Sequence, residues 1–362
     1  MMQISPETQL FIREHSSDDV RVLALQAKKY PDIDMPTAIT QIAGRKVAAE
    51  KIPSWWEIEK IWYPKHLSLE QCSSEITARY KARLLQGDSL TDLTGGFGID
   101  CSFLATGFKS ATYVERQEEL CEIAAHNFPV LNLNHINIKN EDGVTYLQAM
   151  SPVDCLFLDP ARRNEHGGKT VAISDCEPNV AELEELLLQK ANRVMIKLSP
   201  MLDLSLALKE LKQTQEVHIL SVNNECKELL ILLGQTSPAE ISIHCVNLFT
   251  KGTQKEQHFV FTREQEQCSE CTYTDSLETY LYEPNASLLK AGAFRSIAAA
   301  YPVRKLHPNS HLYTSDTFIE NFPGRIFRIV NQCSFNKKEV KENLADLKKA
   351  NVTVRNFPAT VA

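Results

Sequence analysis

An acidic residue and a glycine-rich turn occupy residues 92–98, which read DLTGGFG. Apolar residues on both sides predict a strand that ends at Asp92 and a helix that follows Gly98, and a second apolar strand ends at Glu115. Glycines let the backbone approach a ligand closely, and a helix start presents free N–H groups. Glu115 lies roughly 20 residues beyond the turn, at the spacing of a carboxylate that binds a ribose diol. This stretch therefore predicts a nucleoside site.

The residues around the turn favour one nucleoside cofactor over another. A dinucleotide fingerprint would read G-x-G-x-x-G, but Cys101 occupies the third glycine position. Asp92 places an anion beside the turn, where it would repel a pyrophosphate and attract an ammonium group. Because glycine turns also occur at ordinary strand–helix junctions, we weigh the turn, Asp92 and Glu115 together. Together they predict S-adenosylmethionine, which carries an ammonium group, a ribose and an adenine.

A second candidate for chemistry is the segment LFLDPARR, which ends a predicted strand over 154–158. In methyltransferases that act on exocyclic base nitrogens, this strand end carries D/N-P-P-aromatic, whose oxygens orient the amine of a flipped base. Here Asp159 and Pro160 are present, Ala161 replaces the second proline, and Arg162 and Arg163 replace the aromatic residue. Asp159 can still accept a hydrogen bond from an amine or act as its base.

The two arginines have two interpretations. An arginine such as Arg162 can bind guanine or a phosphate group. Alternatively, Arg162 and Arg163 form ion pairs with Asp175 or Glu177.

Further polar residues follow other predicted strands. Asp142 is a candidate acceptor for the adenine amine, with a plain turn as the alternative. Lys197, near the end of a strand over 193–198, could hold a substrate phosphate or pair with Asp159. Asn223 and Asn224 could line the same site. Convergence of such residues at one sheet edge is what a ligand site in an open α/β sheet requires.

Strands and helices alternate from about residue 90 to residue 234, which predicts a parallel sheet. Seven strands with a final antiparallel pair predict a Rossmann-like class I methyltransferase sheet. We expect four parts: a helical N-terminal domain, the methyltransferase domain, a β-hairpin and ferredoxin-like segment, and a small α+β C-terminal module. Their predicted bounds are 1–85, 86–236, 237–322 and 323–362. Because the sequence ends soon after a predicted strand, a truncated C-terminal module is one alternative. Within the last two segments we expect edge strands in ISIHCVNLFT and HFVFT, a helix near 286–300, a helix over 336–350 and a strand over 351–357.

Two regions outside the sheet could contact ligands. The segment IPSWWEIEKIWYP holds Trp55, Trp56 and Trp62, and its packing on the next domain is favoured over base stacking. The helix that begins near residue 75 carries Lys81, which we expect either to contact the cofactor or to lie on an amphipathic packing helix.

The composition is that of an ordinary globular protein, with 362 residues, 43% hydrophobic and 23% charged. No apolar run approaches the roughly 20 residues that span a bilayer, and the N-terminal sequence lacks a secretory pattern. Cys268 and Cys271 form a C-x-x-C without a second pair at zinc spacing. We therefore expect free thiols in the cytoplasm and no metal, with a structural zinc site as the alternative.

Charge is distributed unevenly along the chain, whose net charge is −7. Residues 1–83 carry a net +1, residues 84–283 a net −15 and residues 284–362 a net +7. A basic C-terminal module on an acidic body suggests a polyanion-binding appendage. The alternative is a solvated helix face, because five lysines cluster in one short stretch: Lys337, Lys338, Lys341, Lys348 and Lys349.

The segments EQCSSEITARYKA, DLTGGFGID, YVER, LFLDPARR and KLSPMLD resemble a bacterial family of class I S-adenosylmethionine-dependent methyltransferases, whose members carry ferredoxin-like and THUMP-like C-terminal domains. EPNASLLKAGAF and ANVTVRNFP are similar to those last two domains. The sequence is more distantly similar to trimethylguanosine synthases and ribosomal RNA guanine-N2 methyltransferases. The resemblance implies methyl transfer, and the THUMP-like domain implies structured RNA.

We therefore expect a methyltransferase that acts on a base of transfer or ribosomal RNA, with guanine N2 as a candidate atom. The alternatives are a methyltransferase for a protein or small molecule, and a non-catalytic protein that binds the cofactor. The expected catalytic residues are Asp159, Pro160, Arg162 and Lys197. The expected cofactor residues are Asp92, Thr94, Gly95, Gly96, Gly98, Asp100, Glu115, Arg116, Asp142 and Lys81.

Overall fold

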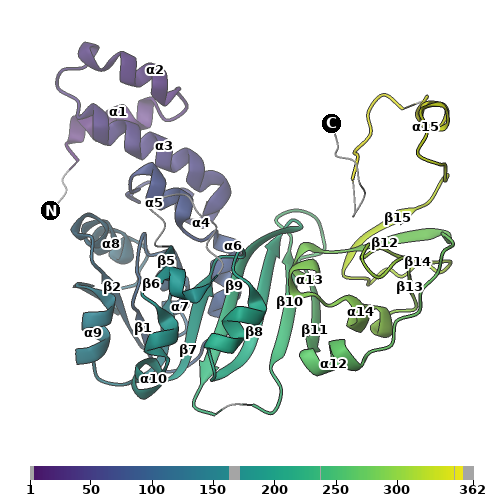
Figure 1. Ribbon diagram of the computed structural model, residues 1–362. Helices are drawn as coiled ribbons and strands as arrows, with labels where there is room; N and C mark the ends of the chain where they lie inside the picture. The colour runs from purple at the N-terminus through teal and green to yellow at the C-terminus, as the bar shows by residue number, and fades with distance from the viewer. Residues whose placement is uncertain (1–3, 163–171, 237, 346, 354–362) are drawn as a thin grey trace. The chain divides into compact units, whose positions relative to one another are not determined.

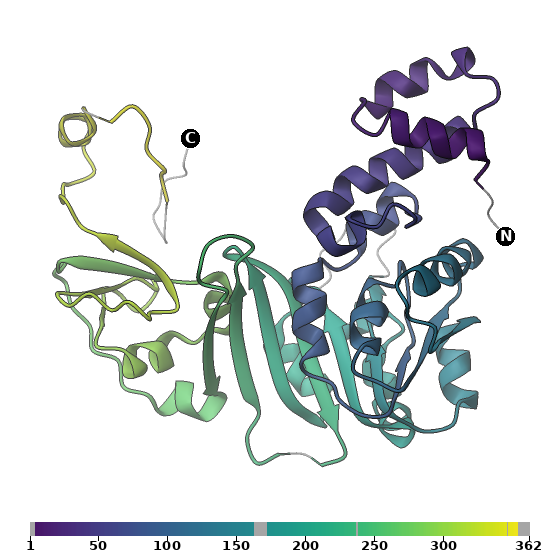
Figure 2. The ribbon, with the colours of Figure 1, turned by 180° about the vertical axis from the view of Figure 1, so that it is seen from behind.

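The computed structural model describes residues 4–162, 172–236, 238–345 and 347–353 (Figures 1 and 2). Two compact units are distinguished by their internal contacts. The first comprises Met1–Gln215 with Leu229–Pro238, and the second comprises Glu216–Glu228 with Ala239–Ala362. Within the described residues, no helix combines the length and the apolar character that crossing a membrane would need.

A mostly parallel sheet carries the residues predicted to do chemistry (Figure 1). Its strand order is β11-β10-β8-β9-β7-β4-β1-β2-β3. The strands are β1 (Ser89–Asp92), β2 (Ser110–Glu115), β3 (Ile136–Asn140), β4 (Val153–Leu158), β7 (Ala191–Leu198), β8 (Thr214–Val222), β9 (Glu225–Gly234), β10 (Ser242–Leu248) and β11 (Glu256–Thr262).

The order β3-β2-β1-β4-β7-β9-β8, with β9 antiparallel to β7, confirms the predicted class I methyltransferase sheet. The predicted edge strands β10 and β11 are also present and extend the sheet beyond β8, so it has nine strands rather than seven. In β9 the run Leu229–Leu233 is buried throughout. A continuous apolar run of this kind is typical of strands that are covered on both faces.

Helices connect the parallel strands and follow the predicted pattern (Figure 2). They are α7 (Ile99–Ala105), α8 (Glu118–Val130), α9 (Gly143–Ala149), α10 (Val180–Lys190) and α11 (Leu204–Glu210). A short hairpin of β5 (Ala161–Arg162) and β6 (Cys176–Glu177) was not predicted.

The N-terminal region is helical, as predicted. It contains α1 (Pro6–Glu14), α2 (Val20–Leu25), η1 (Ala27–Lys29), α3 (Met35–Lys51), α4 (Pro53–Trp56), α5 (His66–Gln71) and α6 (Glu75–Ala82). Trp55 is buried and meets Phe97 of the glycine turn edge-on, with ring centroids 5.2 Å apart. Trp62 stacks on His126, whereas Trp56 is 41% exposed. The packing interpretation therefore holds for Trp55.

The second unit also contains a four-stranded antiparallel sheet, in the order β13-β14-β12-β15. Its strands are β12 (Tyr280–Pro284), β13 (Arg304–Lys305), β14 (Tyr313–Ser315) and β15 (Gly324–Arg328). The helices of this part of the chain are α12 (Arg263–Cys268), α13 (Ala286–Ala291), α14 (Phe294–Ala300) and α15 (Lys337–Leu344).

Three details of this unit differ from the predictions. The helix expected over 286–300 is divided into α13 and α14, because Gly292 adopts the left-handed conformation (φ +76°) that ends a helix. Helix α15 ends at Leu344 instead of continuing to residue 350. Of the strand expected over 351–357, residues 351–353 have no regular structure, and the remainder lies outside the described residues.

Candidate active site

The glycine turn joins β1 to α7 and is held against β2. The Gly95 amide donates to the Val114 carbonyl at 2.8 Å, and the Tyr113 hydroxyl donates to the Gly96 carbonyl at 2.5 Å. The Tyr113 ring lies 2.2 Å from the position that a Cβ on Gly95 would take. Gly96 has φ +53°, in the left-handed region that favours glycine. The turn therefore needs glycines at both positions.

Glu115, at the end of β2, is 8% exposed and fixed by two backbone amides. Its Oε2 accepts a hydrogen bond from the Gly96 amide at 2.9 Å, and its Oε1 accepts one from the Gln117 amide at 2.8 Å. A carboxylate offers about four acceptor positions, so Glu115 retains capacity for hydroxyl donors. Glu115 thus links the turn to the second strand and keeps acceptor positions beyond those that the two amides use.

Asp92, at the end of β1, is buried with one oxygen satisfied and one not. The Thr94 amide donates to Asp92 Oδ1 at 2.9 Å. Asp92 Oδ2 has no hydrogen-bond partner among the described residues, and the residue is only 1% exposed. The pKa of Asp92 is raised to about 8, chiefly by burial and with smaller contributions from the nearby acids Asp100, Asp159 and Glu115, while the hydrogen bond from Thr94 acts to lower it. A buried acceptor of this kind is stabilised by a cationic donor.

A buried ionic network lies beside Asp92. Lys81 is fully buried on α6, pairs with Asp100 Oδ1 at 2.8 Å and donates to Ser73 Oγ at 2.7 Å. The Ser73 hydroxyl donates to Asp100 Oδ2 at 2.7 Å. Lys197 on β7 donates to Ser73 Oγ at 3.3 Å, lies 3.7 Å from Asp100 Oδ2 and pairs closely with Asp159 Oδ2. The network therefore runs from Lys81 to Asp159.

The two acids of the network have opposite pKa shifts. Burial acts to raise the pKa of Asp100, but the ammonium groups of Lys81 and Lys197 outweigh it and hold that pKa below its ordinary value. Burial raises the pKa of Asp159, and Lys197 opposes the rise only in part. The Asp159 side chain is 36% exposed, against 10% for Lys197. Asp159 is thus the accessible end of the network.

Thr94 connects the end of β1 with the residue that follows β4. Its amide binds Asp92, while its hydroxyl oxygen accepts a hydrogen bond from the Asp159 amide at 2.6 Å. Because β1, β2, β4 and β7 run parallel, Asp92, Glu115, Asp159 and Lys197 meet at the carboxyl edge of the sheet. Of the two alternatives predicted for Lys197, the pairing with Asp159 is present.

Other predicted residues have structural contacts of their own. Asp142 Oδ1 caps α9 by accepting from the amides of Val144 and Thr145, both at 3.0 Å. Arg116 pairs with Glu177 at 3.2 Å on the surface. A cofactor role for Asp142 and Arg116 remains a prediction.

Other predicted residues lie in the β5–β6 hairpin and in the turn that follows β8. Arg162 lies in β5, and Arg163 lies outside the described residues. Asn223 and Asn224 form the turn between β8 and β9 in the second unit, where they bind Thr250 and Ala286.

Ser73 joins this network in a way that no sequence pattern indicates. Its hydroxyl contacts Asp100, Lys81 and Lys197, whereas a serine just before a predicted helix indicates only a helix cap. The available signal was Lys81 itself, because a lysine on the buried side of a packing helix needs partners.

The strand order and the polar carboxyl edge define a class I methyltransferase fold. The chain belongs to the bacterial methyltransferase family that carries ferredoxin-like and THUMP-like C-terminal domains. It is 34% identical to a candidate methyltransferase from Porphyromonas gingivalis W83, whose crystal structure matches with a TM-score of 0.86 over 99% of this chain and 91% of that one. Family models match a ferredoxin-like domain at residues 280–323 and a THUMP domain-like segment at residues 324–362.

More distant similarities carry no argument, because their TM-scores are low. An rRNA methylase from Streptococcus thermophilus is 14% identical with a TM-score of 0.32, over 44% of this chain and 93% of that one. A candidate methyltransferase from Streptococcus mutans in complex with SAH is 13% identical with a TM-score of 0.32, over 44% of this chain and 96% of that one. A comparison with curated proteins gives no match.

The burial of Asp92 leads to a prediction for stability. In the unfolded chain its carboxyl ionises near pH 3.9, whereas in the fold its pKa is about 8. Between these values the folded state retains a proton that the unfolded state has lost, so stability falls as pH rises. Asp92→Asn should therefore stabilise the ligand-free protein, with a gain that grows from pH 5 to pH 8 by at most about 1.4 kcal/mol per pH unit.

Urea unfolding at pH 5, 6, 7 and 8 measures this difference. Asp88→Asn is the matched control, because Asp88 is exposed beside the other end of β1 and should show no such trend. If the free energy of unfolding differs between Asp92→Asn and wild type by the same amount at every pH, Asp92 is not a buried carboxyl group that stays protonated in the fold.

Proposed function

We propose that the protein transfers a methyl group from S-adenosylmethionine to a base of structured RNA, with an exocyclic amine such as guanine N2 as the candidate acceptor. The observation that carries the proposal is the buried Asp92 Oδ2, which lacks a partner within the described residues. Membership of the methyltransferase family supports methyl transfer. The THUMP-like match at residues 324–362 supports RNA as the substrate.

The residues at the edge fit the cofactor in three places. Asp92 would take the ammonium group, and Glu115, already held by the turn, would take the ribose hydroxyls. Because Asp142 uses Oδ1 to cap α9, its other oxygen would be the acceptor for the adenine amine. The bound cofactor would supply an electrophilic methyl group on a sulfonium.

Asp159 is the residue suited to the acceptor. Its raised pKa brings it closer to the range in which a carboxylate can accept a proton, and its partial exposure lets a substrate reach it. An amine that donates to Asp159 would have its lone pair oriented for attack, and its proton would pass to this carboxylate or to water. Lys197, anchored by Ser73, holds Asp159 in position.

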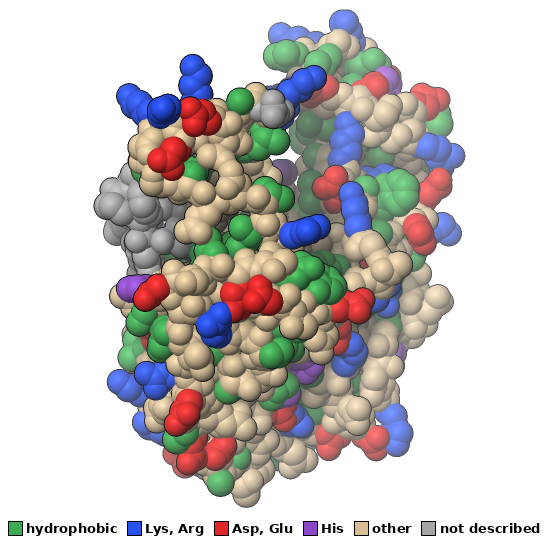
Figure 3. All heavy atoms as spheres, turned by 90° about the vertical axis from the view of Figure 1, so that its right-hand side faces the viewer, with side chains coloured by type: hydrophobic (Ala, Val, Ile, Leu, Met, Phe, Trp, Pro, Cys, Tyr) green, Lys and Arg blue, Asp and Glu red, His purple; other side chains and the backbone are tan. Residues whose placement is uncertain are grey.

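The C-terminal module is the candidate RNA contact. Helix α15 has no buried residues, and Lys337, Lys338 and Lys341 on it are exposed. On the face drawn in Figure 3, however, Lys and Arg side chains are interspersed with Asp and Glu and do not form one continuous basic surface. We expect these three lysines to contribute phosphate contacts if RNA binds this module.

Cofactor binding can be tested by calorimetric titration with S-adenosylmethionine and S-adenosylhomocysteine. An ammonium group beside Asp92 should favour the ionised carboxylate, so binding should release a proton near pH 7 and strengthen as pH rises towards 8. Asp92→Asn should weaken binding by about 100-fold and remove the proton release. Asp88→Asn should leave both unchanged. Absence of heat with either ligand would contradict the cofactor assignment.

The acceptor role can be separated from cofactor binding. Asp159→Asn keeps an acceptor oxygen but cannot take a proton, and Lys197→Met removes the positioning ammonium. We expect either change to lower methyl transfer by about 10²- to 10⁴-fold with little effect on cofactor affinity. Labelled-methyl incorporation into RNA from cells that lack the gene measures this. Full activity in Asp159→Asn would exclude Asp159 as the base.

RNA binding should depend steeply on salt. The binding constant of the full chain for transfer RNA and for ribosomal RNA fragments can be measured by filter binding at several salt concentrations. Its logarithm should fall linearly with the logarithm of the salt concentration. The triple change Lys337→Ala, Lys338→Ala and Lys341→Ala should lower the slope by up to about 3, or about one per phosphate contact. Lys28→Ala with Lys29→Ala, in the N-terminal region, is the control. No binding at low salt, with methylation that survives ribonuclease treatment of a lysate, would favour a protein or small-molecule substrate.

A further inference from the structure

Three histidines and a glutamate share one face of β8, β10 and β11, all within the second unit. Glu216 and His218 are two residues apart on β8 and therefore point to the same side. His244 on β10 pairs with His218 across the parallel ladder. His258 on β11 pairs with Val246, which lies two residues along β10 from His244, so it joins the same face.

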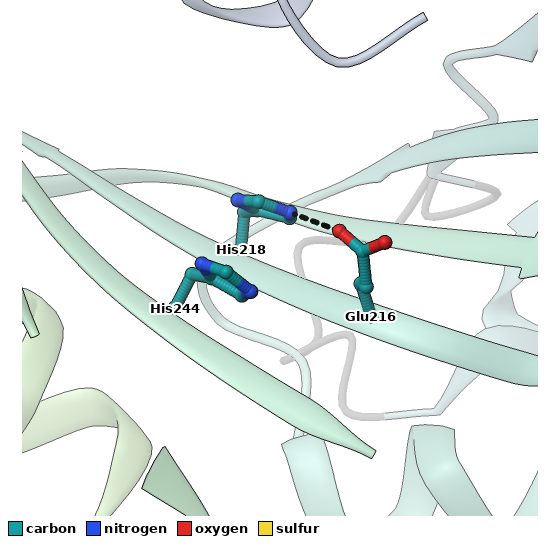
Figure 4. A group of neighbouring side chains, drawn as sticks. All are labelled: Glu216, His218 and His244. Carbon is teal, nitrogen blue, oxygen red and sulfur yellow. Dashed lines mark hydrogen bonds and ion pairs between the residues drawn. The ribbon is translucent and has the colours of Figure 1, made fainter. Parts of the chain in front are cut away.

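Figure 4 shows the side chains of Glu216, His218 and His244, which lie close together on this face. His218 Nε2 lies 3.3 Å from Glu216 Oε2, and His244 Nδ1 lies 3.1 Å from His258 Nε2. The rings of His218 and His244 stack with centroids 4.3 Å apart. One ligand atom from each of Glu216, His218 and His244 lies within 4.8 Å of the other two.

The opposite face of the same strands has a different composition. Val217, Ile219, Ile243 and Cys245 are all buried there, as expected for a sheet core. On the face that carries the cluster, His218 is equally buried, at 2% exposure, but it has a polar imidazole side chain where an aliphatic one would be expected. Adjacent imidazoles with a carboxylate are a donor set suited to zinc-class metals, whereas magnesium and calcium prefer oxygen ligands.

We propose that Glu216, His218 and His244 bind a divalent transition metal ion of the zinc class, with His258 placed to complete a four-coordinate site. Stacked imidazoles do not direct their lone pairs at one point, because the rings are tilted by only 16°. Binding therefore requires a ring to turn about its Cβ–Cγ bond, which is a soft torsion for histidine. The bound ion would tie β8, β10 and β11 together in the second unit.

Metal-stripped full-length protein, titrated with Zn²⁺ in competition with a chromophoric chelator, tests the proposal. We expect one equivalent to bind, a rise in Tm with Zn²⁺ but not with Mg²⁺, and a four-coordinate visible spectrum with Co²⁺. His244→Gln and His218→Gln should each weaken binding by about 100-fold or more. The chain's other candidate, Cys268 with Cys271, supplies the control: Cys268→Ser with Cys271→Ser should bind like wild type.

Two results from the variants would overturn the proposal. One is wild-type affinity in both histidine variants, and the other is loss of binding in the cysteine variant. Imidazole resonances of the wild-type protein provide a test without substitution, in case a variant fails to fold. Zn²⁺ should shift the signals of the clustered histidines selectively among the ten in the chain. Equal or absent shifts in all of them would also contradict the site.

Discussion

Four carboxyl groups lie close together in a largely buried region at the carboxyl edge of the sheet, and their mutual repulsion when ionised constrains the rest of the site. Asp92, Asp100 and Glu115 are each less than a tenth exposed, and Asp159 adds a fourth carboxyl group. Lys81 and Lys197 compensate Asp100 and Asp159, and two amides hold Glu115. Asp92 keeps an oxygen that the described residues do not satisfy. The fold therefore retains a position that a cation would stabilise.

The backbone supports this arrangement by locking the ends of the strands together. Thr94 joins the end of β1 to the residue that follows β4, and Glu115 joins the end of β2 to the turn. Helix α6, which precedes the sheet in the sequence, places the Lys81 ammonium group against the Asp100 carboxylate and so compensates part of its charge. A few short hydrogen bonds thus connect the end of β1, the glycine turn, the end of β2 and the residue that follows β4.

Much of the sheet and its edge could be predicted, because both depend on local patterns. Apolar runs fixed the strands, and parallel order then required Asp92, Glu115 and Asp159 to lie at one edge. Contacts that form only in the tertiary structure could not be predicted from such local patterns. Ser73 and Lys197 are 124 residues apart in the sequence, so no local spacing pattern predicts the hydrogen bond between them. The proposed metal site likewise depends on the register between β8 and β10, which places His218 beside His244. This register cannot be predicted from the sequence of either strand alone.

The central claim is that Asp92 is a buried carboxyl group that becomes ionised when a cationic ligand binds. Carboxyl ¹³C NMR of aspartate-labelled protein, with Asp92→Asn to assign the signal, measures its pKa with and without S-adenosylhomocysteine. The account predicts a pKa of about 8 in the free protein and a fall towards the ordinary range in the complex. A carboxyl that is already ionised at pH 5 in the free protein, or whose pKa the ligand leaves unchanged, would contradict it.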